Sequence, residues 1–256
     1  MKMERSKIAR LDCKNMSLYF EKILFFKNNA TSKNKSNDKK LILIRDILDK
    51  STRIGKYLNY LAERHEKLVS TLRNQRNHRY IKITGQVKRR MLVGAGNPSP
   101  WEVGFTFSRN YGVPIIPASS IKGCFRHFLE DKGEDSKARK LFGTGGEESA
   151  SEGNIIFLDA IPINSLRLGI DLINCHFQPY YSDTKCEKPP NDWYNPVPVY
   201  YLVIEEGIFR FDIFVIDNEV NIEEITEDFK TMLEEYGIGA KTSYGYGRFK
   251  KIEIQK

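Results

Sequence analysis

The sequence predicts an α+β fold in which a basic helical extension, residues 1–79, packs on a core domain, residues 80–256. Three observations lead to this prediction. The first third of the chain combines helical apolar spacing with a high positive charge. After Tyr80, segments that alternate between apolar and polar residues, as strands do, are interleaved with two segments of helical spacing. Stretches rich in Gly, Pro and Asn separate these segments and predict long loop insertions.

The positive charge is concentrated near the N-terminus. Residues 1–90 contain 24 Lys and Arg against 8 Asp and Glu and so carry +16, whereas the remaining residues carry −8 and the whole chain carries +8. A separation this large favours a basic part that faces a polyanion and an acidic part that faces other proteins. The alternative is that the basic residues only solubilise an N-terminal helical layer.

Composition argues against several classes of protein. Hydrophobic residues make up 40% of the chain, but no apolar run approaches ~20 residues, so we expect no membrane span. The segment MKMERSKIARLD lacks the apolar core of a signal peptide, so we expect a cytoplasmic protein. The four cysteines form no C-x-x-C pair, which predicts reduced thiols. Cys175, His176 and Cys186 have a spacing that matches no known zinc finger, so we expect neither a metal nor a cofactor.

The extension is predicted to consist of helices joined by a polar linker. Residues 17–28 predict a short aromatic-rich helix, and residues 28–40, rich in Asn, Ser and Lys, predict a linker or mobile loop. Residues 41–50 and 52–77 predict two further helices. The second of these has one basic face and one apolar face, and the apolar face comprises Ile54, Tyr57, Leu58, Leu61, Leu68 and Leu72.

The core domain predicts six main segments. In order, these are a strand at 80–93, a helix at 119–131, a strand at 154–163, a strand hairpin at 197–217, a helix at 221–236 and a strand at 246–254. We expect Ser119 or Ser120 to cap the first helix, the hairpin to turn at Glu206–Gly207, and residues 164–196 to form a long loop. The order strand, helix, strand, strand, helix, strand is that of the ferredoxin-like fold, which RNA-recognition domains share.

A glycine-rich loop, GIGAKTSYGYG at residues 237–247, separates the last helix from the last strand. It is not a mononucleotide loop of the Walker type, because Ala240 stands where a glycine should adjoin the lysine and because a helix precedes the loop. Backbone N–H groups, together with Lys241 and Arg248, could still hold an anion. The hypothesis that this loop contacts the backbone of a long polyanion therefore remains open. The GAGNPS segment is a weak dinucleotide signal, since Ser99 replaces the third glycine.

The start of the helix at 119–131 is a second candidate anion site. Ser119, Ser120 and Lys122 lie at its predicted N-terminus, and Arg126 follows one turn later. Helix N–H groups, hydroxyls and two cations make a suitable phosphate contact. The alternative is an ordinary helix cap beside a solvent-exposed lysine.

These stretches, in this order, resemble the RAMP superfamily of CRISPR ribonucleoproteins. That superfamily is marked by a glycine-rich loop between the last helix and the last strand, which GIGAKTSYGYGRF matches. IPASSIKG is similar to the IPGSSIKG-type segment of the superfamily, with Ala118 in place of the usual glycine, and LFG…GNIIFLDA (141–160) is similar to a further RAMP segment. The segments 94–123 and 175–202 resemble the sixth-subunit family of type III-B, or Cmr, effector complexes, in which histidine is more usual at Ser99.

The resemblance, which covers about residues 80–256, implies a non-catalytic structural subunit that binds guide RNA and caps the filament near the 3′ end of the guide. The implied partners are the guide RNA, the backbone RAMP subunit, the small helical subunit and the first RAMP subunit. His176, Tyr180 and Tyr181 are predicted to stack on RNA bases, although such aromatic residues can also pack on their own sheet. The predicted RNA-binding residues are Ser119, Ser120, Lys122, Arg126, Gly237, Gly239, Lys241, Thr242, Ser243, Tyr244, Gly245, Gly247 and Arg248.

Two other function classes remain open at this point. Some RAMP relatives cut guide precursors with a histidine near the glycine-rich loop, so a metal-independent endoribonuclease is the alternative to a binder. His127 and His176 are the histidines inside the resembling region, and His176 is the better candidate because His127 is predicted in mid-helix beside Phe125 and Phe128. A protein-only scaffold is the third class, and salt-dependent RNA binding would separate it from a binder.

Overall fold

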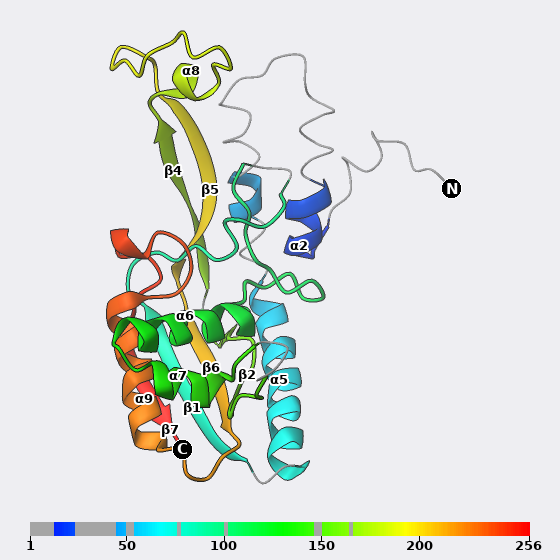
Figure 1. Ribbon diagram of the computed structural model, residues 1–256. Helices are drawn as coiled ribbons and strands as arrows, with labels where there is room; N and C mark the ends of the chain where they lie inside the picture. Colours follow the sequence, from blue (N-terminus) through cyan, green and yellow to red (C-terminus); the bar gives the residue numbers. More distant parts are fainter. Residues whose placement is uncertain are drawn as a thin grey trace.

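The computed structural model (Figure 1) describes residues 13–23, 45–49, 54–75, 78–99, 102–145, 150–163 and 166–256. Its main sheet is antiparallel, with the strand order β2-β6-β1-β7, and β3 also pairs with β6. The combination of helices with an antiparallel sheet confirms the predicted α+β class. The strands are β1 (Arg79–Val87), β2 (Ile155–Phe157), β3 (Ile161–Pro162), β6 (Ile208–Val215) and β7 (Phe249–Gln255).

One face of the main sheet is covered by α6 (Ala118–Asp131) and α9 (Ile222–Thr231), which continues as a π-helical turn, Met232–Tyr236. The ring of Phe211 in β6 lies 5.6 Å from that of Phe229 in α9 and 5.4 Å from that of Phe249 in β7. Edge-to-face contacts of this kind contribute roughly 0.5–1.5 kcal/mol each beyond the area they bury. The predicted helices at 119–131 and 221–236 and the predicted last strand are therefore confirmed.

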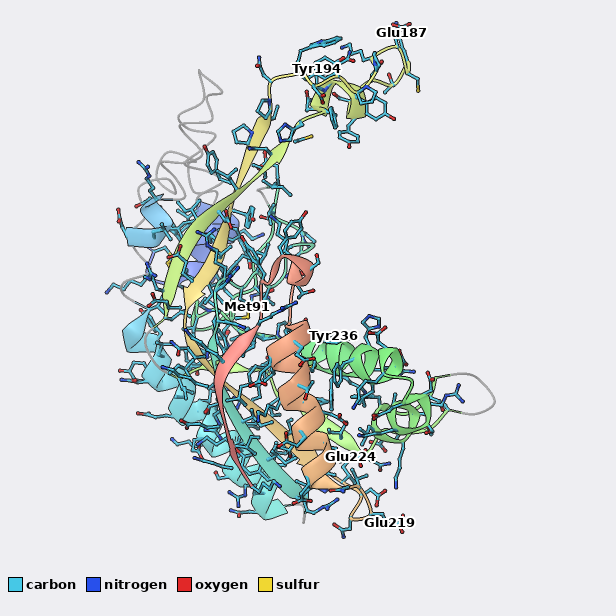
Figure 2. All side chains as sticks on the ribbon, turned by 90° about the vertical axis from the view of Figure 1, so that its left-hand side faces the viewer. Met91, Glu187, Tyr194, Glu219, Glu224 and Tyr236 are labelled. Atoms are coloured by element: carbon cyan, nitrogen blue, oxygen red, sulfur yellow. The ribbon has the colours of Figure 1, made fainter. Side chains whose placement is uncertain are left out.

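Helix α5 (Gly55–Gln75) lies on the opposite side of the sheet from α6 and α9, as Figure 2 shows. It confirms the helix predicted at 52–77, and its buried Leu58 and Leu61 join the main hydrophobic core. Leu68, however, is 47% exposed, so the predicted apolar face is only partly buried.

A buried polar network holds the middle of α5 on the sheet. His65 Nε2 lies 2.7 Å from a carboxylate oxygen of Asp212, which is 1% exposed. Arg210 donates to Asp212 from Nε at 2.9 Å and also pairs with Glu66 of α5. The hydroxyl of Tyr80 donates to Asp212 as well. These donors are required because an unpaired charge in the interior would be costly.

The extension is described only in part. Met16–Leu18 (α2) and the π-helical turn Tyr19–Ile23 lie within or beside the helix predicted at 17–28, and residues 45–49 are helical. The ring of Phe20 packs 5.9 Å from that of Phe107 in the core domain. The linker predicted at 28–40 lies outside the described residues.

The largest correction concerns the strand hairpin predicted at 197–217. The strand β5 (Val197–Glu206) does not pair with β6 but with β4 (Arg167–Cys175), in a separate two-stranded sheet. Gly207 alone separates the end of β5 from the start of β6, so the chain passes from one sheet to the other without a hairpin turn. The prediction of a long loop at 164–196 is also wrong, because this segment contains β4 and the short helix α8 (Gln178–Tyr181). We call β4, β5 and the residues between them the arm (Figure 1).

Two element boundaries also differ from prediction. The first strand ends at Val87 rather than at 93, although Met91 forms an isolated bridge with Ile204 of the arm. The strand predicted at 154–163 is divided into β2 and β3, and both parts pair with β6.

The cap of α6 is not a serine. The helix begins at Ala118 after Pro117, and no side chain at the N-cap position accepts a hydrogen bond. The carboxylate of Asp159 instead accepts the backbone N–H of Ala118 at 2.8 Å. The prediction of Ser119 or Ser120 as the cap is wrong because a residue distant in sequence supplies the acceptor.

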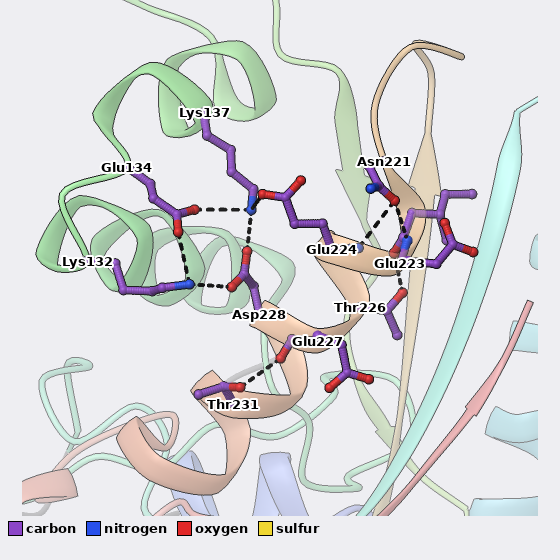
Figure 3. Close-up of polar contacts among 11 residues, drawn as sticks. Lys132, Glu134, Lys137, Asn221, Glu223, Glu224, Thr226, Glu227, Asp228 and Thr231 are labelled. Atoms are coloured by element: carbon purple, nitrogen blue, oxygen red, sulfur yellow. Dashed lines mark hydrogen bonds and ion pairs between the residues drawn. The ribbon is translucent and has the colours of Figure 1, made fainter.

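Helix α7 (Asp135–Phe142) was not predicted, and an ion-pair cluster ties it to α9 (Figure 3). Asp228 of α9 accepts from Lys132 at 2.7 Å and also from Lys137, which in turn contacts Glu224 at 2.5 Å and Glu134 at 3.1 Å. Burial acts to raise the pKa of Asp228, but the two lysines outweigh burial and hold this pKa below its ordinary value. The cluster is therefore charged and paired at neutral pH.

Within the described part of the chain, none of the helices combines the length and the apolar character that a membrane span requires.

Replacing Asp228 with Asn tests the cluster. Because Asp228 is only 9% exposed and is shared by two lysines, Asp228→Asn is expected to lower the free energy of unfolding at pH 7 by about 1–3 kcal/mol. The depressed pKa stabilises the fold above about pH 4 and this contribution disappears as the pH falls further. Denaturant unfolding from pH 3 to pH 7 measures both effects. The exposed Glu130→Gln control should change stability by less than about 0.5 kcal/mol, and equal effects of the two variants would contradict the assignment.

Candidate nucleic-acid interface

The glycine-rich loop folds back on the segment that follows β1. The N–H of Ala240 donates to Leu92 O at 2.8 Å, and the N–H of Gly247 donates to Arg90 O at 2.7 Å. Gly239 and Gly247 both have positive φ angles, and a Cβ there would lie 2.4 Å from Leu92 O and 1.9 Å from Ile238 O, respectively. Both glycines are therefore required because the protein's own backbone approaches them closely. Both were predicted to contact RNA.

The outer turn of the loop, Thr242–Tyr244, projects from this packed base. It is a 3₁₀ turn flanked by two left-handed residues, Lys241 with φ 62° and Gly245 with φ 81°. A Cβ at Gly245 would meet no atom within 4 Å, so this glycine is required by its φ angle and not by packing. The turn leaves Ser243 exposed and presents the side chain of Tyr244 at 79% exposure.

Lys241 points into the protein. Its ammonium donates to the hydroxyl of Tyr201 in β5 and lies 4.4 Å from the centroid of that ring. This side chain was predicted as a phosphate contact, and the structure shows that it also joins the loop to the arm. Arg248 is half-buried, and its Nε has no hydrogen-bond partner among the described residues.

Asp171 of β4 fastens the other end of the loop. It accepts a hydrogen bond from the hydroxyl of Tyr246 and one from Arg90 Nη1 at 2.6 Å. Burial, followed by the hydrogen bond to Asp171, raises the pKa of Tyr246 to about 12. Burial acts to raise the pKa of Asp171, but its hydrogen bonds to Tyr246, the N–H of Leu172 and Arg90 lower it overall. The phenol is thus protonated and the carboxylate charged at neutral pH.

A cavity of about 530 Å³, here called the glycine pocket, lies between the loop and α6. It brings together four of the predicted RNA-binding residues, Ser120, Gly237, Gly239 and Thr242, and adds residues 94–96 as a further glycine-containing wall. The thiol of Cys124 closes one side by donating to Gly237 O at 3.2 Å. Burial raises the pKa of this thiol to about 11, so it is not a thiolate at neutral pH.

The start of α6 suits phosphate less well than the sequence indicated. The carboxylate of Asp159 already occupies the N-terminus of the helix, and a second anion there would be repelled. Ser119 and Lys122 are exposed near this end, and Arg126 pairs with Glu130 at 2.8 Å. Lys122 has no ion pair among the described residues, so it is the cation of this helix that is free for a ligand.

The two histidines lie in the segments predicted for them, His127 within α6 and His176 between β4 and α8. His127 is exposed and lines the glycine pocket. His176 follows β4 on the arm, with Tyr180 and Tyr181 of α8 at 45% and 70% exposure. Figure 1 shows α8 at the end of the arm far from the main sheet, and Figure 2 shows Tyr194 in the same distant part. The predicted stacking residues and the glycine-rich loop are therefore separate surfaces, and the histidine near the loop is His127.

A second cavity, of about 650 Å³ and here called the basic groove, is lined by Tyr244 of the outer turn, whereas Thr242 of the same turn lines the glycine pocket. The cations of the basic groove are not among the predicted RNA-binding residues, although the basic run Val87–Arg90 is visible in the sequence at the end of the first strand. Tyr244 and Tyr246 form one side of it. Its charged lining residues are Lys88, Arg89, Arg90, Arg167, Glu205, Glu206 and Lys250.

In the described residues one group of carboxylates has the spacing of metal ligands. Oxygens of Glu134, Glu224 and Asp228 lie within 4.8 Å of one another. The ammonium groups of Lys132 and Lys137 already contact all three carboxylates and offset two of their three negative charges. We assign no metal to this cluster.

Comparisons with known proteins agree with the sequence pattern. Residues 86–250 match the profile of the RAMP superfamily. The chain is 31% identical over 232 residues to the CRISPR system Cmr subunit Cmr6 of Pyrococcus furiosus, covering 65% of this chain and 67% of that protein. It is 30% identical over 241 residues to the Cmr6 subunit of Saccharolobus solfataricus, covering 87% and 77%.

A solved structure is also similar. A chain of the type III-B Cmr-β complex bound to cognate target RNA, determined by cryo-electron microscopy, superposes with a TM-score of 0.61 at 28% identity. The match covers 88% of this chain and 78% of the other.

Two glycine substitutions separate packing from backbone conformation in the loop. Gly247→Ala places a methyl group against Ile238 O and also requires a positive φ, so we expect a loss of stability of about 3 kcal/mol or more. Gly245→Ala meets open space and requires only the positive φ, so we expect a loss of about 1 kcal/mol. Thermal unfolding of both variants measures the difference. Equal losses would show that the loop is not packed as described.

Proposed function

The chain belongs to the RAMP superfamily, and on this premise we propose that it is a non-catalytic, RNA-binding structural subunit of a type III-B CRISPR ribonucleoprotein. In this proposal it caps the filament near the 3′ end of the guide RNA. Its protein partners are the backbone RAMP subunit, the small helical subunit and the first RAMP subunit. We also propose that the main sheet is ferredoxin-like, which the strand order β2-β6-β1-β7 supports.

One observation carries the RNA-binding part of the proposal. The glycine-rich loop separates a pocket lined by glycines and hydroxyls from a groove lined by cations, and it presents an exposed tyrosine between them. Backbone N–H groups, hydroxyls and cations contact phosphate and sugar, and an exposed aromatic ring can stack on a base. The type III-B Cmr-β complex that contains the structural relative is bound to target RNA, which supports the same class of ligand.

The partner part of the proposal is supported by the arm. A two-stranded hairpin that projects from a domain has little stability of its own. Leu172, Ile173 and Val197 leave apolar side chains exposed on it at 45%, 46% and 39%. Trp193 near the tip is 78% exposed. Burial of this surface against neighbouring chains and RNA would stabilise both the arm and the assembly.

The second candidate function is a metal-independent endoribonuclease, and the position of His127 is the observation that favours it. An imidazole beside the glycine-rich loop could act on a 2′-hydroxyl in the pocket. A cleaving site also needs a second group that stabilises charge, and within the described residues no lysine or carboxylate is hydrogen-bonded to His127. The thiol of Cys124 beside it is protonated at neutral pH. We therefore keep the binder as the proposed function.

A single lysine tests binding at α6. Lys122→Ala should weaken the affinity of the purified protein for single-stranded RNA about fivefold, with a melting temperature close to that of the wild type. The slope of log affinity against log salt should fall by about 0.7. Arg139→Ala, which removes an exposed cation of α7, is the control and should leave the affinity unchanged. Loss of stability with intact RNA binding would assign Lys122 to folding instead.

The absence of cleavage is tested directly. The protein is incubated with labelled repeat RNA and with single-stranded RNA, with and without magnesium, and the products are resolved on a denaturing gel. We expect intact RNA, because neither surface assembles an acid–base pair among the described residues. Specific cleavage that His127→Ala abolishes and His176→Ala leaves unchanged would establish the nuclease and refute the binder. The reverse pattern would also establish a nuclease, with its site on the arm.

A further inference from the structure

The basic groove is built on a rigid base. It lies where the end of β1, the base of the arm and the start of β7 meet. The N–H of Val87 donates to Gly207 O at 2.9 Å, and the N–H of Lys88 donates to Arg248 O at 2.8 Å. In the main sheet Gln86 of β1 is directly opposite Lys250 of β7. The cations of the groove are therefore carried by backbone that long-range hydrogen bonds hold in place.

Two of the five cations in the groove are already neutralised. Arg167 contacts Glu205 at 3.0 Å and Glu206 at 2.5 Å. Arg90 contacts Asp171 at 2.6 Å. Arg90 and Asp171 cancel each other, whereas Arg167 and its two glutamates together retain one negative charge.

The other three cations of the groove are Lys88, Arg89 and Lys250. All three are exposed, and within the described residues none of them has an ion-pair partner. These three cations and the one excess negative charge of the Arg167 group leave a net charge of +2 around one cavity of about 650 Å³, which creates a local positive potential. The chemistry of the groove therefore favours an anion that offers several charges in a row.

Tyr244 narrows the choice of anion. Its ring lines the groove and is 79% exposed, although an exposed aromatic side chain contributes little to stability where it stands. The outer turn that presents Tyr244 is preceded by Lys241 in the left-handed conformation. This conformation costs roughly 1–2 kcal/mol for a residue other than glycine. A row of cations beside an exposed aromatic ring is the arrangement that binds single-stranded nucleic acid, with phosphates on the cations and a base on the ring. An acidic peptide would use the cations but not the ring.

We propose that a single RNA strand crosses the outer turn of the glycine-rich loop, from the glycine pocket into the basic groove, with one base stacked on Tyr244 and the following phosphates bound by Lys88, Arg89 and Lys250. This inference rests on the proposed RNA-binding function. The loop has the required form, because Gly239 and Thr242 line the pocket and Tyr244 lines the groove. In this proposal the strand passes over the loop from one cavity to the other.

The experiment measures RNA binding by the full chain as a function of salt. The probe is a fluorescently labelled single-stranded RNA, compared with the same strand carrying abasic positions. Arg89→Ala/Lys250→Ala should lower the salt slope by about 1.4, since each phosphate contact contributes about 0.7 for single strands. Arg139→Ala/Lys230→Ala removes the same charges from α7 and α9 and should leave the slope unchanged. Melting curves of each variant confirm that it is folded.

Tyr244 is tested by a matched pair of substitutions. Tyr244→Ala should weaken binding of the intact strand about 5- to 150-fold, whereas Tyr244→Phe should retain it. On the abasic strand Tyr244→Ala and the wild type should bind equally.

Each outcome has a distinct meaning. No binding of RNA by the wild type would refute the proposed function. Binding with an unchanged slope in Arg89→Ala/Lys250→Ala would refute the groove and leave the proposed function standing. A reduced slope with Tyr244→Ala equal to wild type on the intact strand would refute base stacking. If polyglutamate displaces the RNA as effectively as unlabelled RNA does, the groove is a general anion site and the proposal is wrong.

Discussion

The carboxylate of Asp171 is the contact on which the whole interface depends. It accepts from Tyr246 of the glycine-rich loop and from Arg90 after β1, so it joins three segments that are far apart in the sequence. Each hydrogen bond to a charged group contributes on the order of 1.5–3 kcal/mol, and more is lost when the partner is left unpaired. Lys241, which donates to Tyr201, is a further attachment of the loop to the arm.

The position of the two cavities follows from that attachment. The base of the loop is held by hydrogen bonds to Arg90 and Leu92, and its side chains Lys241 and Tyr246 are held by the arm. One side of the loop then faces α6 and the other faces the cations after β1. The glycines permit this packing, and the side chains of the outer turn remain free for a ligand.

The arm and the loop form two surfaces that are suited to different parts of one assembly. The loop offers cations, hydroxyls and one tyrosine near the main sheet. The arm carries apolar and aromatic side chains to a distant tip (Figure 1). An RNA-binding subunit among other subunits needs both kinds of surface, because phosphate contacts give affinity and apolar burial holds neighbouring chains.

The sequence by itself determined the family, and it determined those helices and strands whose buried residues recur at a regular spacing. The helices at 52–77 and 221–236 and the last strand follow from apolar spacing, and the RAMP motifs follow from short runs of residues. Periodicity reports which residues are buried, but it does not report against what they are buried. The run at 197–217 therefore predicted two strands correctly and their pairing wrongly, because β5 and β6 belong to different sheets. For the same reason the tertiary structure alone decided that Asp159 caps α6, that Lys241 faces inward, and that His127 rather than His176 lies beside the loop. Each of these contacts joins residues separated by tens of positions, and only the folded chain brings such residues together.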